Sequence, residues 1–189
     1  MYRIKTVCLI MSILSVINAA ANWVPISAND PADAKVTLQN SDIQSSVLTF
    51  KTEGFWLKEV ITSKGKAVII ETEKGTPILD GNSPDLEKLT ASVIIPDLDK
   101  MEVNILSSEY SEYSDIHVAP SKGNLLRTIN PNDIPYNYGE VYNRDEFYPG
   151  NLAELRAPYV LRDFRGQTVV IYPFQYNPVQ KVLRVYRNI

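Results

Sequence analysis

Hydrophobic and polar residues alternate with a period of two over much of the chain. The run 101–105 (MEVNI) would place three apolar side chains on one face of a strand and two polar side chains on the other. The composition and alternation of other runs predict further strands, at residues 34–38, 46–52, 56–62, 67–72, 90–95, 168–176 and 181–187. The pattern therefore predicts a protein built mainly of β-strands.

Turn residues separate several of these predicted strands. Residues 63–66 (SKGK) predict a hairpin turn, and residues 176–180 (YNPVQ) predict a second turn, because proline fixes φ and asparagine tolerates tight bends. Residues 83–88 (SPDLEK) predict one short helical turn. Since we find no repeat and no interdomain linker, the sequence predicts a single all-β domain, an antiparallel β-sandwich of jelly-roll-like form.

The segment 119–157 interrupts this regular pattern. It is rich in proline and glycine, has little periodicity, and carries a group of aromatic residues at Tyr136, Tyr138, Tyr142, Phe147 and Tyr148. Loops this long are uncommon inside compact domains and are often functional, and aromatic side chains usually pack against a surface. The sequence thus predicts a long irregular loop region that packs onto the sandwich or onto a partner.

The N-terminus has the features of a secretory signal peptide. Arg3 and Lys5 give a positive start, residues 6–17 are apolar and uncharged, and residues 19–21 are small. The apolar run is too short to cross a bilayer, which takes roughly 20 residues. We therefore expect a signal peptide over residues 1–21 and a domain over residues 22–189 without a transmembrane segment. This domain would be exported through the inner membrane to the periplasm, the cell surface or the extracellular space.

The residue inventory gives little support for catalysis. The sole cysteine, Cys8, lies in the predicted signal peptide, and His117 is the only histidine, so a cysteine nucleophile with its base and a multi-ligand zinc site are both missing. No spacing singles out a carboxylate pair for glycoside hydrolysis. A net charge of −3 offers no basic surface for nucleic acid. The sequence predicts no catalytic residue, metal or cofactor, and places His117 at a surface or a strand edge.

Two charged segments are candidates for a contact with a partner. Residues 162–167 (RDFRGQ) predict a turn with local ion pairs, with a docking patch as the alternative. Residues 119–131 (APSKGNLLRTINP) have proline near both ends, and residues 125–128 would be held extended, as in a peptide that enters a cleft. Arg127 would then present a guanidinium that fits a carboxylate with two hydrogen bonds. The residues alone also allow a solvated loop arginine here.

Short motifs in the second half of the chain resemble the gingipain propeptide family. They are APSKG (119–123), IPYNYG (134–139), FYPG (147–150), LRDFRGQ (161–167) and QYNPV (175–179), with a weaker upstream match at KGTPIL (74–79). The motifs follow one another in the family's order and at similar spacing. The resemblance covers roughly residues 62–189 and is densest after residue 119.

The resemblance implies a β-sandwich-like pro-region that precedes a caspase-like cysteine protease domain in the same chain. Such a pro-region assists folding of the protease and blocks its cleft until it is removed by proteolysis. The resemblance assigns to Arg127, flanked by Leu126 and Thr128, the role of filling the specificity pocket of an arginine-specific protease. It also implies that residues 22–189 are a C-terminally truncated pro-region of a cysteine-type endopeptidase precursor.

Three alternatives remain open at this point. The first is a secreted β-sandwich module for binding or adhesion, whose exposed tyrosines would stack on a ligand. The second is a free-standing secreted inhibitor that acts in trans. The third, an enzyme in its own right, has the least support, because the chain lacks a nucleophile and clustered metal ligands.

Overall fold

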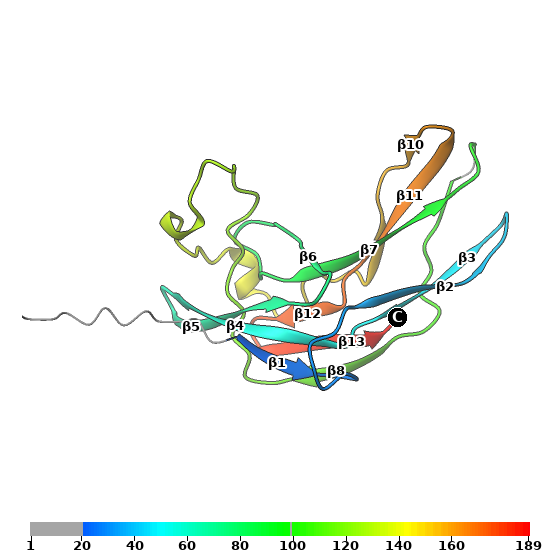
Figure 1. Ribbon diagram of the computed structural model, residues 1–189. Helices are drawn as coiled ribbons and strands as arrows, with labels where there is room; N and C mark the ends of the chain where they lie inside the picture. The colour runs from blue at the N-terminus through cyan, green and yellow to red at the C-terminus, as the bar shows by residue number, and fades with distance from the viewer. Residues whose placement is uncertain (1–20, 99) are drawn as a thin grey trace, which may run out of the picture.

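The computed structural model describes residues 21–98 and 100–189 (Figure 1). Residues 1–20, which hold nearly all of the predicted signal peptide, lie outside the described residues. The strands are β1 (Ala21–Pro25), β2 (Lys35–Ser41), β3 (Ser46–Lys51), β4 (Gly54–Thr62), β5 (Gly65–Glu71), β6 (Thr76–Pro77), β7 (Glu87–Ile94), β8 (Glu109–Tyr113), β9 (Ala153–Leu155), β10 (Tyr159–Leu161), β11 (Phe164–Ile171), β12 (Phe174–Asn177) and β13 (Val182–Asn188). Two short 3-10 helices, η1 (Pro131–Asp133) and η2 (Glu140–Asn143), lie in the long loop region.

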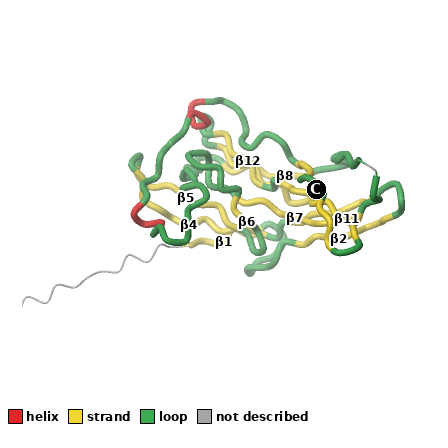
Figure 2. The backbone as a smooth tube through the Cα atoms, turned by 90° about the horizontal axis from the view of Figure 1, so that it is seen from above, coloured by secondary structure: helices red, strands yellow, loops and turns green. Residues whose placement is uncertain are grey.

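The strands form three antiparallel sheets that are arranged as two layers. One layer is the sheet β12-β13-β3-β2, with β8 paired to β13. The other layer contains the sheet β1-β4-β5 and the sheet β10-β11-β7-β6, with β9 paired to β11. Figure 2 shows the strands running along the molecule, with the loops that carry η1 and η2 at one end. The predicted all-β, antiparallel class is confirmed, and the long irregular loop region lies between β8 and β9.

Two clusters of buried side chains hold the layers together. The first lies between β4-β5 and β12-β13 and consists of Phe55, Ile70, Leu86, Val118, Phe174, Tyr176, Leu183 and Val185. The second lies between β3 and the β7-β11 pair and consists of Ala34, Phe50, Leu89, Val169 and Ile171. The sheet that contains β13 and β3 therefore forms one whole layer, which we call the common sheet. The β1-β4-β5 sheet packs on its β12-β13 part, and the β7-β11 pair packs on its β3 part.

Both predicted turns are confirmed. The β4-β5 hairpin turns at Ser63 and Lys64, and Gly65 follows with a φ of 104°, a left-handed value that favours glycine. The β12-β13 hairpin is closed by the side chain of Asn177, whose Oδ1 accepts the backbone N–H groups of Val179 and Gln180 at 3.1 and 3.0 Å. Such an asparagine turn satisfies the backbone locally.

Three predicted elements differ from the structure. Residues 101–105 pair with no neighbouring strand, and the predicted alternation holds only in part, because Met101 and Val103 are half-buried whereas Ile105 is exposed. Residues 83–88 form no helical turn. The backbone of residues 83–85 pairs with residues 119–121, as in the bond from Asp85 N–H to Ala119 O (2.8 Å), and residues 87–88 begin β7. The predicted run 168–176 is two strands, since the chain breaks at Tyr172 and Pro173, and proline lacks the N–H that a strand ladder needs.

Candidate functional site

The segment that leads into the candidate loop is fixed by backbone hydrogen bonds to two elements. Ala119 N–H donates to Val68 O (2.8 Å), which ties the segment to β5. Ser121 N–H donates to Ser83 O (2.7 Å), and Ser121 O accepts the N–H of Asn82 (2.9 Å). Residues 118–121 are buried. The chain therefore enters the loop from a rigid base.

The side chain of Lys122 closes this loop at its base. Its Nζ donates to Pro131 O at 2.7 Å and lies 4.1 Å from the centre of the Tyr136 ring. Asn130 caps η1, because its Oδ1 accepts the N–H of Asn132 at 3.1 Å. Residues 122–131, which we call the Arg127 loop, thus have both ends held together by one lysine.

A β-turn forms the tip of the Arg127 loop. Ile129 N–H donates to Leu126 O at 2.9 Å, which places Arg127 and Thr128 at the two central positions of the turn. The prediction that residues 125–128 are extended is therefore wrong for this structure. Leu126, Arg127 and Thr128 are all exposed. Their side chains are presented by a turn instead of by a strand-like peptide.

Arg127 differs from many charged residues near the loop region. Among the described residues, its guanidinium has no hydrogen-bond, ion-pair or ring partner. Arg144 pairs with Glu146 (3.3 Å), and Arg156 pairs with Glu154 (3.4 Å). An arginine without a partner at the tip of a braced loop is free to bind an external acceptor.

Tyrosines of the loop region brace the loop against the sandwich. Tyr138 Oη lies 2.8 Å from Thr62 Oγ1, and its ring meets the Tyr142 ring edge-on at 4.7 Å. Tyr142 Oη donates to Val118 O at 3.0 Å, and burial raises the pKa of Tyr142. Tyr148 Oη donates to Asp80 at 3.1 Å. These hydroxyls serve the fold, so the tyrosines form no open stacking platform.

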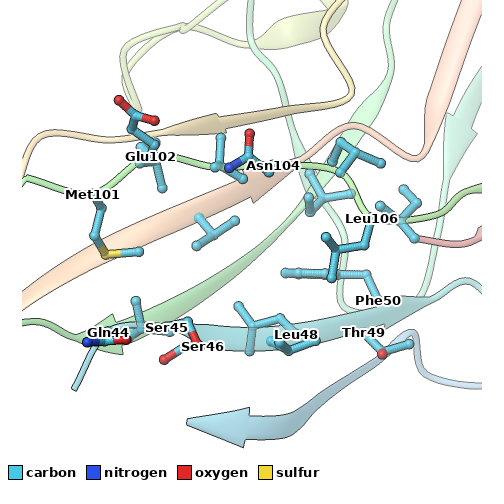
Figure 3. A pocket seen from close by; sticks show the side chains of 18 of the residues that line it. Gln44, Ser45, Ser46, Leu48, Thr49, Phe50, Met101, Glu102, Asn104 and Leu106 are labelled. Atoms are coloured by element: carbon cyan, nitrogen blue, oxygen red, sulfur yellow. The ribbon is translucent and has the colours of Figure 1, made fainter. Parts of the chain in front are cut away.

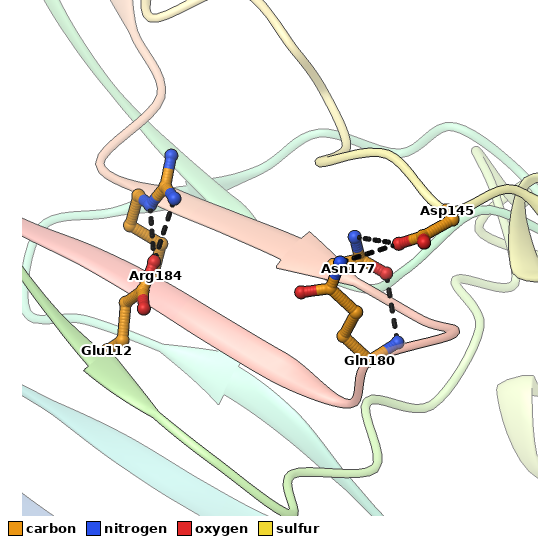
Figure 4. A network of polar contacts seen from close by, with 5 residues as sticks. All are labelled: Glu112, Asp145, Asn177, Gln180 and Arg184. Atoms are coloured by element: carbon orange, nitrogen blue, oxygen red, sulfur yellow. Dashed lines mark hydrogen bonds and ion pairs between the residues drawn. The ribbon is translucent and has the colours of Figure 1, made fainter.

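A polar network fixes the far end of the loop region (Figure 4). Asp145 Oδ1 accepts the amide N–H groups of Asn177 (2.8 Å) and Gln180 (2.7 Å), which ties the loop to the β12-β13 turn. Nearby, Arg184 donates from Nε and Nη2 to Glu112 Oε1 at 3.0 and 2.7 Å. The same guanidinium lies over two aromatic rings, those of Tyr110 (4.4 Å) and Phe147 (3.9 Å). One arginine thus connects β13, β8 and the loop region.

Two partly buried carboxyl groups, those of Asp85 and Glu87, lie where β7 begins, with Asp85 N–H bonded to Ala119 O and Glu87 beside Thr72. Burial, with a smaller contribution from the charge of Glu71, raises the pKa of Asp85 to about 6. Burial also raises the pKa of Glu87 to about 7, although its Oε2 accepts the N–H of Thr72 at 2.6 Å. The carboxylates of Glu71, Asp85 and Glu73 add repulsion. Both carboxyl groups therefore have a raised pKa, because burial disfavours their charged form.

The remaining predicted candidates are surface features. His117 is exposed, with Nε2 at 3.7 Å from Asp115 Oδ1, which agrees with its interpretation as a surface residue. Arg162 and Asp163 form the turn of the β10-β11 hairpin, so the predicted turn is present at these two residues, whereas residues 164–167 belong to β11. Within residues 21–98 and 100–189, no group of three His, Cys, Asp or Glu side chains is arranged to hold a metal ion. No helix in this part of the chain is long and apolar enough to cross a membrane.

A groove of about 830 Å³ lies between β3 and the β7-β11 pair (Figure 3). Its lining mixes aliphatic side chains with polar ones, and the unpaired segment 101–105 forms part of it. The side chains labelled in Figure 3 include Leu48, Met101 and Leu106. The sequence pattern predicted that Met101 faces inward and that Leu48 lies on a strand, but it did not predict the groove, because the groove depends on how the sheets are packed.

Comparisons with known proteins agree with this fold. The family model Propeptide_C25 matches residues 27–189. Gingipain R2 of Porphyromonas gingivalis is 40% identical over 155 residues, which are 82% of this chain and 21% of the relative. Gingipain R1 of the same species is 37% identical over 152 residues, which are 80% of this chain and 15% of the relative. The chain thus spans about a fifth of the length of gingipain R2.

Two solved structures resemble the chain. One is the complex of the Porphyromonas gingivalis RgpB pro- and mature domains, with a TM-score of 0.79, 40% identity and coverage of 82% of this chain and 80% of that chain. The other describes the zymogenic latency of gingipain K from Porphyromonas gingivalis, with a TM-score of 0.73, 19% identity and coverage of 89% and 94%, and it shows the fold alone. On the family match and the identity to gingipain R2, the chain belongs to the gingipain propeptide family.

Proposed function

We propose that the chain is the pro-region of a secreted, gingipain-like cysteine endopeptidase precursor. It binds the caspase-like protease domain of the same polypeptide, assists its folding and keeps its cleft blocked until the pro-region is removed. A signal peptide at residues 1–21 directs the precursor out of the cytoplasm. Arg127 enters the specificity pocket of the protease, and Leu126 and Thr128 contact the rim of that pocket.

The main support for this proposal is the way in which the structure presents the side chain of Arg127. Its guanidinium is exposed and unpartnered at the tip of a turn, and the turn stands on a loop that Lys122 and Tyr136 hold closed. A preorganised loop loses little conformational entropy on binding, so more of the contact energy appears as affinity. A tethered pro-region also binds at a high effective concentration. Together these effects allow strong inhibition from one dominant contact.

The turn at residues 126–129 suggests how Arg127 avoids being cut as a substrate. Proteases generally read substrates as extended strands, and the bond from Ile129 N–H to Leu126 O holds this segment in a different backbone form. The guanidinium can reach a pocket while the bond after Arg127 stays out of line with the nucleophile. The alternative of a ligand-binding module has less support, because its stacking residues, Tyr138, Tyr142 and Tyr148, are engaged with the sandwich.

Inhibition in trans tests the proposal directly. The purified chain, shown to be folded by circular dichroism, is titrated against the mature protease domain of gingipain R2. We expect tight inhibition by the wild-type chain. Replacing Arg127→Ala removes a buried charged contact, which costs about 2–5 kcal/mol and raises the inhibition constant roughly 30- to 4,000-fold. Arg127→Lys keeps the charge without the planar fork and should give an intermediate value.

The matched control is Arg187→Ala. Arg187 is also an exposed arginine, but it lies on β13 and pairs with Glu109 at 2.9 Å. This variant should inhibit like the wild-type chain. Equal inhibition by the Arg127→Ala chain would move the contact elsewhere on the pro-region. A folded wild-type chain that does not inhibit at all would contradict the pro-region function and favour the binding module.

A further inference from the structure

The tip of the β10-β11 hairpin, together with the end of β7, exposes an apolar surface that the fold does not explain. Four large hydrophobic side chains there are exposed: Tyr159 (40%), Leu161 (67%), Phe164 (59%) and Ile94 (69%). Contiguous apolar surface of this kind on a soluble protein often marks an interaction site. We call these four residues the hairpin face.

Strand register places the four side chains on one side of the sheet. Tyr159 pairs with Gly166, which pairs in turn with Ile94, and Leu161 pairs with Phe164. Directly paired residues point to the same face, as do residues two apart on one strand. The row Tyr159–Gly166–Ile94 and the neighbouring pair Leu161–Phe164 therefore form a single surface.

Glycine at position 166 keeps this surface flat. The Tyr159 ring lies across Gly166, and a Cβ at that position would stand 2.8 Å from Tyr159 Cζ. A larger residue would push the ring away from the sheet. The Tyr159 ring therefore covers the one position of β11 that has no side chain, in the same row as Ile94.

The opposite face of β7 and β11 packs in the core. Leu89 and Val169 point toward β3 and belong to the second core cluster. A strand pair with one face in the core normally presents polar residues on the other. The outer face follows this rule at its middle, where Ser92 Oγ lies 3.2 Å from Thr168 Oγ1, and departs from it at the tip. The apolar tip is therefore a local feature and not a general property of these strands.

The hairpin face and the Arg127 loop lie on the same side of the molecule. In Figure 1 the β10-β11 hairpin and the loop region that carries η1 both project upward, at opposite ends, from the common sheet below. In the same figure β2 and β3 lie below the β7-β11 pair, so the outer face of the pair is turned away from them. Seen from above in Figure 2, the loop region and the β10-β11 hairpin lie at opposite ends of the molecule. A single globular partner seated on this side would reach both.

We propose that the hairpin face is a second docking surface for the protease domain, and that it seats on an apolar patch of the protease away from the specificity pocket. This inference rests on the proposed function. A relative has been solved as a complex of its pro- and mature domains, and the hairpin face continues the side on which the Arg127 loop projects. The loop determines which protease is blocked, and the hairpin face supplies apolar contact area that slows dissociation.

The test compares two variants of the same hairpin. The double variant Leu161→Ser/Phe164→Ser removes two exposed side chains of the hairpin face. The control, Val160→Ser, removes an equally exposed side chain (72%) that points to the opposite face, because Val160 pairs with Arg165. Both are titrated against the mature domain of gingipain R2, with circular dichroism as the check on folding. We expect the double variant to raise the inhibition constant roughly tenfold or more, mainly through faster dissociation, and the control to stay within about twofold of the wild-type chain.

A second measurement does not depend on any variant. Hydrogen exchange of the wild-type chain with and without the protease domain should show slower exchange at residues 159–166 in the complex. If the double variant inhibits like the control and residues 159–166 exchange equally fast in both states, the inference fails while the proposed function stands. If the wild-type chain does not inhibit, both fail. If the wild-type chain is a dimer that the double variant abolishes with unchanged inhibition, the face binds a second copy and the inference is overturned.

Discussion

At the scale of single residues, the fold shifts the pKa values of two buried or partly buried carboxyl groups in opposite directions. Two lysines surround the buried carboxylate of Glu53, with Lys35 Nζ at 2.8 Å and Lys51 Nζ at 3.1 Å, and hydrogen bonding from Lys35 is the main cause that lowers its pKa to about 2. Its stabilising contribution is present above its unfolded value of 4.5 and is lost as the pH falls toward 2. Glu87 behaves in the reverse way, because burial raises its pKa to about 7.

The raised pKa of Glu87 gives a signed prediction. Because the folded state holds this proton more tightly than the unfolded chain, the free energy of unfolding falls as the pH rises from about 4.5 to about 7. In the variant Glu87→Gln the side chain can still accept the N–H of Thr72 and carries no charge. We expect it to be more stable than the wild-type chain at pH 8 by about 1–2 kcal/mol, a value discounted for partial exposure.

Urea unfolding at pH 5 and pH 8 measures this effect. In the Glu87→Gln variant, the free energy of unfolding should differ less between pH 5 and pH 8 than it does in the wild-type chain. Adding Asp85→Asn should reduce this difference further. The control is Glu59→Gln, because Glu59 is an exposed residue of β4. A Glu87→Gln chain whose stability changes with pH as much as that of the wild-type chain would refute the assignment.

At the scale of elements, the Arg127 loop is held mainly by side chains that reach across it. Lys122 joins the start of the loop to its end through Pro131 O and the Tyr136 ring. Gly123 follows with a φ of 74°, and its Cα passes close to the backbone of Gly81. The loop owes its shape to these few contacts, so it can be loosened without unfolding the sandwich.

The variant Lys122→Met tests this element. We expect amide hydrogen exchange at residues 124–130 to become roughly tenfold faster, because local opening requires fewer contacts to break. Inhibition in trans should weaken several-fold, while the free energy of unfolding changes by no more than about 0.5 kcal/mol. Lys66→Met, on the surface of β5, is the control. Unchanged exchange in the Lys122→Met chain would show that the tyrosine contacts alone fix the loop.

At the scale of the whole molecule, stability depends on two separate clusters that share one sheet. Phe174 is fully buried in the first cluster, where its ring meets Phe55 at 5.8 Å. Phe164 has the same side chain but is exposed on the hairpin face. The two phenylalanines therefore form a matched pair for separating folding from recognition.

We expect Phe174→Ala to lower the free energy of unfolding by about 3–5 kcal/mol, because it leaves a cavity in the core. Phe164→Ala should lower it by less than about 1 kcal/mol, since a mostly exposed side chain loses little burial. Urea denaturation of the two variants measures both values. A large loss of stability in the Phe164→Ala chain would mean that the hairpin face belongs to the core, which would also weaken its assignment as a docking surface.

The sequence by itself determined the features that depend on neighbouring residues. Period-two alternation predicted the all-β class, because side-chain direction alternates along any strand, and the asparagine and glycine at the two hairpins predicted their turns. The motifs around Arg127 indicated the family, because they depend only on the order and spacing of residues along the chain. The density of prolines and aromatic residues after residue 119 also predicted a long loop that packs on a surface, and the bond from Tyr142 to Val118 shows that part of this surface is the sandwich itself.

Only the tertiary structure decided the features that depend on residues far apart in the chain. Residues 83–88 carry a helix signal, yet residues 83–85 pair with residues 119–121 and residues 87–88 pair with β6, since hydrogen bonds to fixed neighbours outweigh a weak local preference. The turn that presents Arg127 depends on Lys122 and Pro131 meeting across the loop. The hairpin face exists because β11 pairs with both β10 and β7. Local patterns specify which way each side chain can point, and long-range pairing specifies which residues it contacts.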